Sequence, residues 1–470
     1  MSDVGLALAN PVDIAYLITG ICFIVGLRYL SSPKTARLGN RISALGMLIA
    51  VVAVLTQGIV NWIVVGAALV VGAAVGIVSA QRVKMTAMPQ MVAIFNGAGG
   101  GAAALVAAGE LLKLYQSGTP ATPDVSFTSV LSAVIGALSF AGSIIAFLKL
   151  QEVMTGRPIT YPGQQIVNAL LLLAILVSWG FVVANNPNEL TFFWVALACS
   201  FVLGILFVLP IGGADMPVVI SLLNSFTGLA AAATGFVLGN SVLIIAGALV
   251  GASGTLLTVL MGRAMNRSIT NVLFGAFGAV KTTAAGGAGA KEHNVRSASA
   301  DDVAAMLAYA NEVIIVPGYG MAVAQAQHSI RELEDQLEKR GVEVKYAIHP
   351  VAGRMPGHMN VLLAEANVPY TSLYDMDDIN PEFERADVAL VVGANDVTNP
   401  AARSDTSSPI YGMPILDVDK AANVVVLKRS MNSGFAGIDN PLFDDPKTVM
   451  LFGDAKKSID GVVAGVKALS

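Results

Sequence analysis

The residues best suited to chemistry in this 470-residue chain begin with Gly318 and Gly320, which follow an apolar run, Glu312–Pro317, typical of a buried strand. The next residues, Met321–Arg340, have the spacing of an amphipathic helix. Between a strand and a helix, glycines let the backbone approach a pyrophosphate, and the helix N-terminus stabilises its charge. The third position of this pattern is Val323 rather than Gly or Ala, so a plain strand-to-helix turn stays open as the alternative.

Basic residues after a later strand indicate which dinucleotide such a site would take. A site for NAD(H) usually has a carboxylate at the end of the second strand, but here that strand, Val342–Ile348, leads into His349-Pro350. Lys428-Arg429-Ser430 follows the strand Val424–Leu427, and two cations with a hydroxyl suit a 2′-phosphate. The pattern favours NADP(H), and a solvated basic loop is the alternative.

Two further strand ends carry glycines and polar residues, Gly353-Arg354 and Gly393–Asp396. In a doubly wound sheet, ligands bind beyond the carboxyl ends of the strands, so we expect both segments to face the same ligand. Arg354 suits a phosphate or carboxylate there. His349 and His358 flank it, and we interpret both as loop residues rather than catalysts. No Ser–His–Asp or Cys–His arrangement for covalent catalysis is visible in the sequence.

The first half of the chain has the composition of a membrane protein. Hydrophobic residues make up 55% of the whole chain and charged residues only 13%, about half the share in soluble domains. A span needs roughly 20 apolar residues, and we predict nine spans: Val12–Leu30, Ala44–Val60, Trp62–Ala80, Met91–Leu112, Ser129–Leu148, Gln165–Ala184, Thr191–Leu209, Pro217–Leu238 and Ser241–Gly262. The net charge of −4 excludes a nucleic-acid footprint. Cys22 and Cys199 both lie in apolar runs and predict neither a disulfide nor a metal site.

Basic residues set the expected orientation, because short cytoplasmic loops hold most of the Lys and Arg. One alternate set of loops contains only Lys113, whereas ten basic residues fall on the other set: Arg28, Lys34, Arg37, Arg41, Arg82, Lys84, Lys149, Arg157, Arg263 and Arg267. We therefore expect the N-terminus outside and the C-terminal region in the cytoplasm. No Lys or Arg precedes the first run, so we expect it to stay as a span rather than be cleaved as a signal peptide.

A few polar residues within or beside the spans are functional candidates, because such groups are costly in a membrane. They are Asn96, Glu110, Asn168, Asn224 and Asp215, and no histidine occurs before position 293. Hydrogen bonding between helices is the alternative role for each Asn, and simple solvation is the alternative for Asp215.

We predict three parts: a transmembrane domain at 1–262, a linker at 263–303 rich in small residues, and an NADP(H)-binding, Rossmann-like domain at 304–470. The last part alternates strands with helices, which indicates a doubly wound parallel α/β sheet. Besides the elements above, we expect helices at Met359–Ala366 and Asp454–Ala468 and a strand at Val388–Val392.

Several long stretches carry a specific resemblance. They are Pro317–Gln327, His349–Asn360, Gly393–Ala402, Lys428–Met431 and Gly453–Lys456, with Gly213–Asn224 and Ala264–Ser268 in the membrane half. Over essentially its whole length the chain resembles the β subunit of proton-translocating nicotinamide-nucleotide transhydrogenases.

The resemblance implies that this chain binds NADP(H) and that a separate α subunit, with further transmembrane helices, binds NAD(H). It implies direct hydride transfer between the two nicotinamides, without a catalytic side chain, coupled to proton translocation across a bacterial inner (plasma) membrane, and a dimer of the assembled protomer. It makes 1–262 the proton-translocating domain, places Asn96, Asp215, Asn224 and Arg267 on the proton pathway and assigns no metal. The nucleotide-binding residues that it implies are Gly318, Tyr319, Gly320, Met321, Val351, Ala352, Gly353, Arg354, Met355, Gly393, Ala394, Asn395, Asp396, Lys428, Arg429, Ser430, Met431, Gly434, Phe435, Gly453, Asp454, Ala455 and Lys456.

Two positions depart from the family pattern. Well-known members carry a histidine at the place of Asn96, and a neutral amide does not carry a proton near neutral pH. The accompanying subunit would then supply the titratable group. Phe435 stands where a tyrosine is common in the lid over the nucleotide, so packing can persist there but a hydroxyl contact cannot.

Two other functions fit parts of the sequence. An ion channel or transporter gated by a nucleotide-sensing cytoplasmic domain would have the same architecture. The features that distinguish it from a redox-coupled proton pump are the 2′-phosphate site and a membrane domain without a histidine of its own. A dehydrogenase merely anchored to the membrane would need only one or two spans, so nine argue against it.

Overall fold

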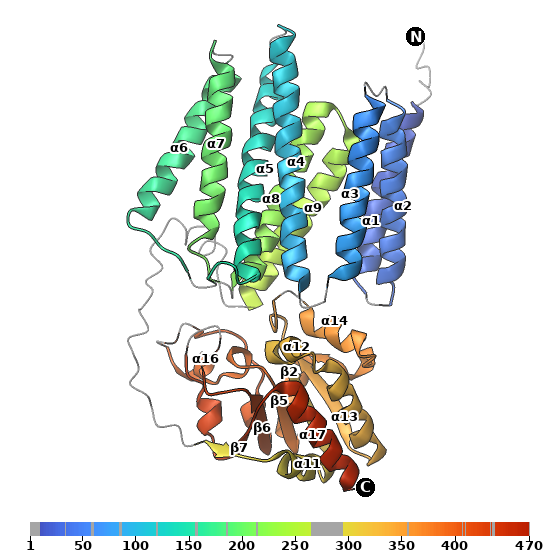
Figure 1. Cartoon of the computed structure of the whole chain (residues 1–470), viewed down its shortest axis with the longest axis vertical. Helices are drawn as coiled ribbons and strands as arrows, with labels where there is room; N and C mark the ends of the chain where they lie inside the picture. The colour runs from blue at the N-terminus through green and yellow to red at the C-terminus, as the bar shows by residue number, and fades with distance from the viewer. Residues whose placement is uncertain are drawn as a thin grey trace, which may run out of the picture. The chain divides into compact units, whose positions relative to one another are not determined.

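The computed structural model describes residues 10–32, 34–57, 61–83, 87–118, 121–155, 158–184, 187–212, 215–264, 295–354, 357–406, 408, 410–432, 434 and 438–469. The chain folds as two compact units, one built mainly from the apolar helices and the other containing the sheet (Figure 1).

The first unit confirms the nine predicted spans. Within the described residues, nine helices are long and apolar enough to cross a membrane: α1 (Pro11–Leu30), α2 (Ala36–Leu55), α3 (Trp62–Arg82), α4 (Met88–Gln116), α5 (Pro123–Leu150), α6 (Gln164–Val183), α7 (Glu189–Val208), α8 (Met216–Leu238) and α9 (Ser241–Ala264). The α2 helix begins eight residues before the apolar run that we expected, Ala44–Val60. The first two turns of α2 contain Arg37 and Arg41, so they are helical but are not part of the apolar run. Hydropathy locates the apolar part of a span, whereas the helix continues into the polar interface.

The outer surface of these helices is apolar. Ile63 on α3 is 83% exposed and Leu105 on α4 is 74% exposed. No side chain of α3 is buried within the chain. Large aliphatic side chains on an outer face are costly in water and favourable in lipid. The chain is therefore an integral membrane protein, as its composition predicts.

The second unit contains a seven-stranded, wholly parallel sheet. Its strands are β1 (Arg296–Ser297), β2 (Glu312–Pro317), β3 (Glu343–Ile348), β4 (Leu373–Asp375), β5 (Val388–Val392), β6 (Asn423–Lys428) and β7 (Thr448–Phe452). Their order is β1-β7-β6-β5-β2-β3-β4, which confirms the doubly wound arrangement. The chain leaves β2 toward β3 and later returns to place β5 on the other side of β2. The switch point of the topology therefore lies between β2 and β5.

The two faces of the sheet are covered differently. Alternate residues of β2, such as Ile315, point toward a core shared with α11 (Ala300–Ala308), α13 (Gln327–Lys339) and α17 (Ala455–Ala468). Figure 1 shows α13 and α17 together over this face of the sheet. The intervening residues, such as Ile314, pack on the other side against Phe383, Leu416 and Phe443 from short 3-10 segments and loops. Burial on both faces explains why these strands have unbroken apolar sequences.

Three details differ from the sequence prediction. The expected helix Met321–Arg340 is two helices, α12 (Tyr319–Ala324) and α13, separated at Gln325, whose backbone is left-handed with φ of 54°. The β1 strand pairs with β7, and α11 begins at Ala300, so regular structure already exists within 295–303, which we assigned to the linker. The short β4 and the apolar β7 have no counterpart in the prediction. The boundaries 1–262, 263–303 and 304–470 stay a prediction.

Candidate functional site

Two glycine loops meet at the switch point of the sheet. The backbone amide of Gly318 donates to Val392 O at 2.9 Å, and that of Gly320 donates to Gly393 O at 2.9 Å. A Cβ added to Gly320 would lie 2.7 Å from Gly393 Cα, so only glycine permits this approach. Loop-to-loop packing therefore accounts for these glycines, and the two amides are not available to a phosphate. The glycines therefore allow the loop after β2 to pack directly on the loop after β5.

The segment after β3 stacks on the first of these loops. The Arg354 guanidinium lies 4.6 Å from the centre of the Tyr319 ring, and the His358 ring lies 6.4 Å from it. The Arg354 amide donates to His358 Nδ1 at 3.0 Å. Burial, followed by the charge of Arg354, lowers the pKa of His358 to about 4. His358 is therefore a neutral structural partner at the start of α14 (His358–Glu365), and the cation beside it is Arg354.

His349 is a second neutral histidine at the end of β3. Its Nδ1 accepts from the Val351 amide at 3.3 Å, so the proton lies on Nε2, which is 2.9 Å from Pro414 O and donates to it. Burial lowers the pKa of His349 to about 4. The side chain links the end of β3 to the segment that precedes β6.

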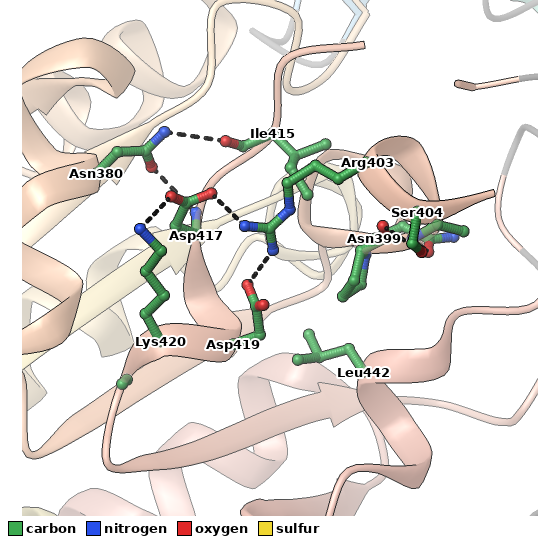
Figure 2. Close-up of polar contacts among 12 residues, drawn as sticks. Asn380, Asn399, Arg403, Ser404, Ile415, Asp417, Asp419, Lys420 and Leu442 are labelled. Carbon is green, nitrogen blue, oxygen red and sulfur yellow. Dashed lines mark hydrogen bonds and ion pairs between the residues drawn. The ribbon is translucent and has the colours of Figure 1, made fainter. Parts of the chain in front are cut away.

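The segment after β5 is held by a polar network that the sequence did not indicate. Figure 2 shows Arg403 on α16 (Ala401–Ser404) between Asp417 and Asp419, with nitrogen-to-oxygen distances of 3.1 and 2.5 Å. Asn380 donates to Ile415 O and accepts from the Asp417 amide, both at 3.0 Å (Figure 2). These contacts join α16 and Asn380 to the residues 415–419, which lie shortly before β6.

The residues after β6 contain the predicted cations. Lys428 is half-buried, with its Nζ 4.5 Å from the centre of the Phe443 ring. Burial lowers the pKa of Lys428, and the carboxylates of Asp396 and Asp439 act in the opposite direction. Arg429 and Ser430 are exposed. The structure thus leaves two side chains of the predicted trio accessible to a ligand and holds the third near carboxylates.

The described residues between β6 and Asn440, namely 429–432, 434, 438 and 439, are together called the strap. Within it, Met431 packs against the core that contains Phe443. Gly434 lies so close to the loop after β5 that an added Cβ would be 2.5 Å from Asn395 Nδ2 and 2.7 Å from Asp396 Oδ1. The strap therefore lies against the end of β5 at this point.

The end of β7 completes the row of strand ends. The Gly453 amide donates to Lys428 O at 3.1 Å, which joins this turn to the end of β6. Asp454 caps α17 by accepting from the Lys457 amide at 3.3 Å. Lys456 is exposed. Capping alone accounts for Asp454.

The structure brings the described nucleotide-site candidates together at the carboxyl ends of β2, β3, β5, β6 and β7. Four of them bury their side chains in the core, so only their backbone could face a ligand: Met321, Ala352, Ala394 and Ala455. Val351 and Gly353 belong to the turn after β3, where Gly353 has φ of 104°. Met355 and Phe435, and Arg267 of the membrane half, lie outside the described residues.

In the membrane unit, Asn96 is the centre of a buried polar cluster. Its Nδ2 donates to Ser143 Oγ at 2.9 Å and to Ser139 Oγ at 3.3 Å, both on α5. Ser139 and Thr227 of α8 lie 2.6 Å apart, oxygen to oxygen. The Asn96 Oδ1 is buried without a hydrogen-bond partner among the described residues. Asn224 is half-buried on α8, one turn before Thr227. The serines and Thr227 are partners that the sequence analysis missed.

The start of α8 follows a turn held by a buried lysine. Lys149 at the end of α5 is 2% exposed and donates to three carbonyl groups at the end of α7, those of Val208, Leu209 and Ile211. Asp215 comes four residues after Ile211 and is half-buried. Lys149 entered the sequence analysis only as a loop cation.

The comparisons with known proteins agree along the whole chain. The family model for the NAD(P) transhydrogenase beta subunit matches residues 12–465. The NAD(P) transhydrogenase subunit beta of Rhodospirillum rubrum is 53% identical over 456 residues, which is 96% of this chain and 97% of that protein. The protein of the same name from a defined strain of that species has the same identity and coverage. The chain therefore belongs to the NAD(P) transhydrogenase beta subunit family.

Proposed function

We propose that this chain is the NADP(H)-binding, membrane-spanning subunit of an enzyme that transfers hydride between NAD(H) and NADP(H) and couples the transfer to proton translocation. Membership of the family makes it part of an oxidoreductase that uses nicotinamide nucleotides. The proposal concerns which nucleotide it binds and what the membrane unit does. An ion channel gated by a nucleotide receives no support from the family.

The observation that carries the cofactor assignment is the set of side chains around the switch point. Exposed Arg429 and Ser430 follow β6, whereas β3 ends in a neutral, buried histidine rather than a carboxylate. A 2′-phosphate would gain hydrogen bonds from Arg429 and Ser430, and the bond to Arg429 would be charge-assisted. A ribose without that phosphate would find His349 where a carboxylate usually accepts from its 2′-hydroxyl. The buried Asn395 Nδ2, which has no partner among the described residues, adds a donor next to the strap. These residues fit NADP(H).

The residues of this chain would bind and orient the nucleotide, and no side chain is needed for the chemistry itself. When bound, the nicotinamide supplies a ring carbon that accepts or donates a hydride. Arg429, Ser430 and Lys428 would hold the 2′-phosphate. Tyr319 and Arg354, already stacked on each other, would form one wall of the site. Gly434 of the strap, which lies against Asn395 and Asp396, would bound the site on another side.

A second nucleotide and a partner complete the proposal. The description of the family as a beta subunit implies an alpha subunit, to which we assign NAD(H) and further transmembrane helices. The Asn96 Oδ1, which has no partner in the described part of the chain, is an acceptor for a protonated side chain of those helices. From the basic residues of the loops, we propose that the sheet domain lies in the cytoplasm. We further propose that the membrane is a bacterial inner membrane and that the assembled protomer dimerises.

The test of the cofactor assignment uses Arg429. Replacing it by Ala in the full-length chain removes a charged partner of the 2′-phosphate, worth about 1.5–3 kcal/mol, so NADPH should bind roughly 10- to 150-fold more weakly. NADH lacks the 2′-phosphate, so its weak binding should not change. Arg385 is exposed just before β5, at the amino-terminal ends of the strands and away from the candidate site, so Arg385→Ala is the matched control. Equal losses for NADPH and NADH, or none for either, would count against the assignment.

A further inference from the structure

Two buried asparagines join the loop after β5 to the far end of the strap. Asn440, 2% exposed, donates from Nδ2 to Asn395 O at 3.1 Å and to Asn395 Oδ1 at 3.2 Å. Asn399, fully buried, donates from Nδ2 to Asp439 O at 3.1 Å. Because these residues are more than 35 positions apart in sequence, each bond closes a long loop. The end of the strap is thus attached to the loop that carries Asn395 and Asp396.

The backbone fixes which way the Asn440 amide faces. The Leu442 amide donates to Asn440 Oδ1 at 3.0 Å, at the start of the 3-10 helix η7 (Pro441–Asp444). An N–H can only donate, so the oxygen of Asn440 must face Leu442 and its NH₂ must face Asn395. That NH₂ in turn requires the oxygen of Asn395 to face it. The orientation of two side chains therefore derives from one backbone amide.

The consequence is an unused donor at the end of β5, beside the candidate site. With its oxygen turned to Asn440, Asn395 presents Nδ2 to the other side, where it is buried and has no partner among the described residues. The Gly434 Cα of the strap lies on that side, since an added Cβ there would be 2.5 Å from this nitrogen. A buried donor without an acceptor is costly, so this one is suited to a ligand oxygen.

We propose that Asn440 is a positioning residue for NADP(H) binding: it holds the Asn395 amide so that Nδ2 donates to an acceptor oxygen of the nucleotide beneath the strap. Asn440 itself need not touch the nucleotide. The proposal rests on the proposed function, because it takes NADP(H) as the ligand of the strand-end site.

The two asparagines supply a matched pair of variants. Asn440→Asp keeps the acceptor for Leu442 but places its other oxygen against Oδ1 and the backbone carbonyl of Asn395. The contact with the carbonyl remains, as in the control below, but the Asn395 side chain relieves the contact with Oδ1 by turning its amide over. The Asn395 Oδ1 then takes the place of Nδ2, so Asn395 offers the site an acceptor and no donor. Asn399→Asp likewise keeps its acceptor for the Ala401 amide, bonded at 3.0 Å, and turns an oxygen toward a carbonyl of the strap. Both variants lose a buried donor and gain a negative charge, but only the first reverses Asn395.

The experiment measures NADPH binding to the full-length chain in nanodiscs by the fluorescence of NADPH. We expect Asn440→Asp to weaken binding about ten-fold, the effect of one lost hydrogen bond, and Asn399→Asp to weaken it less than about two-fold. Asn395→Ala should weaken binding by about the same factor as Asn440→Asp. In the Asn395→Ala background, Asn440→Asp should have almost no further effect, although its charge is still present.

Several results would overturn the proposal. Asn395→Ala with wild-type affinity would show that Nδ2 does not meet the nucleotide, even if Asn440→Asp failed to fold. Equal losses for Asn399→Asp and Asn440→Asp, or an undiminished loss in the Asn395→Ala background, would show a general effect on the strap. Failure of the wild-type chain to bind NADPH would instead contradict the proposed function, and the two failures are therefore distinguishable.

Discussion

Lys149 provides a sharp test of how the membrane unit holds the turn before Asp215. Its Nζ lies 2.7 Å from Ile211 O, 2.5 Å from Leu209 O and 3.4 Å from Val208 O, and the Leu209 carbonyl also accepts from the Ile159 amide at 3.1 Å. The last carbonyls of a helix have no partner within it, and a cation is favourable at this end of the helix dipole. Lys149 thus closes the end of α7 from a neighbouring helix.

The expected cost of removing it follows from these contacts. Each hydrogen bond to a charged group contributes about 1.5–3 kcal/mol, so the two short bonds set an upper limit of about 6 kcal/mol for Lys149→Met. The site lies at a helix end, where water replaces part of the loss, so we expect the free energy of unfolding to fall by about 3 kcal/mol. Lys149→Arg, which keeps the charge and the donors, should recover at least half of this.

The measurement is reversible unfolding in mixed micelles of increasing SDS, followed by the reaction of Cys199 on α7 with a maleimide dye in a Cys22→Ser background. Both cysteines are free and half-buried, so labelling reports exposure. Lys113→Met is the control, because Lys113 is 75% exposed and pairs only with Glu110 at 3.3 Å among the described residues. Its cost should be below about 1 kcal/mol. Similar losses for Lys149→Met and Lys113→Met would refute the reasoning.

Three further outcomes are expected. The purified chain should show no hydride transfer from NADPH to NAD⁺ until an NAD(H)-binding partner is added, because hydride exchange needs two nucleotide sites and we assign one here; robust transfer by the lone chain would contradict this. In vesicles that contain both subunits, Asp215→Asn should reduce proton movement while NADPH binding persists, and normal pumping would make Asp215 a solvated carboxylate. Burial lowers the pKa of His349 and His358 from 6.5 to about 4, so the unfolded chain takes up protons first and stability should fall between about pH 6.5 and 4. Chemical unfolding at pH 7 and pH 5 should show a smaller difference for His349→Gln than for the exposed control His328→Gln.

Strands buried on both faces were predictable, and short or edge elements were not. The bounds of β2 and β5 match their apolar runs because both lie in the middle of the parallel sheet. The three-residue β4 is too short to show a period. The α11 helix did have a signal, a capping box in which the Ser299 hydroxyl accepts from the Asp302 amide and the Asp302 carboxylate accepts from the Ser299 amide. The break at Gln325 has neither Gly nor Pro to mark it.

The candidate site was predictable where it depends on position along a strand, and not where it depends on contacts between distant loops. Strand ends place Arg354, Asn395 and Arg429 at one edge of the sheet, as the sequence pattern requires. The role of Asn440 depends on a hydrogen bond to a residue 45 positions earlier, which no spacing reveals. The glycines show the opposite effect: their pattern matches a phosphate loop, but Gly318 and Gly320 use their amides to bind the loop after β5.

The charge state of the strand-end site bears on where a proton can act. The two histidines that the structure places there, His349 and His358, have a pKa of about 4 because they are buried, so neither changes charge between pH 6 and pH 8. The polar links of the strap, Asn395, Asn399 and Asn440, carry no titrating proton. These five side chains therefore do not make the proposed NADP(H) site sensitive to pH between 6 and 8. Because Asn440 and Asn399 attach the end of the strap to the loop after β5, a displacement of that end would move Asn395 without changing the charge of any of these asparagines.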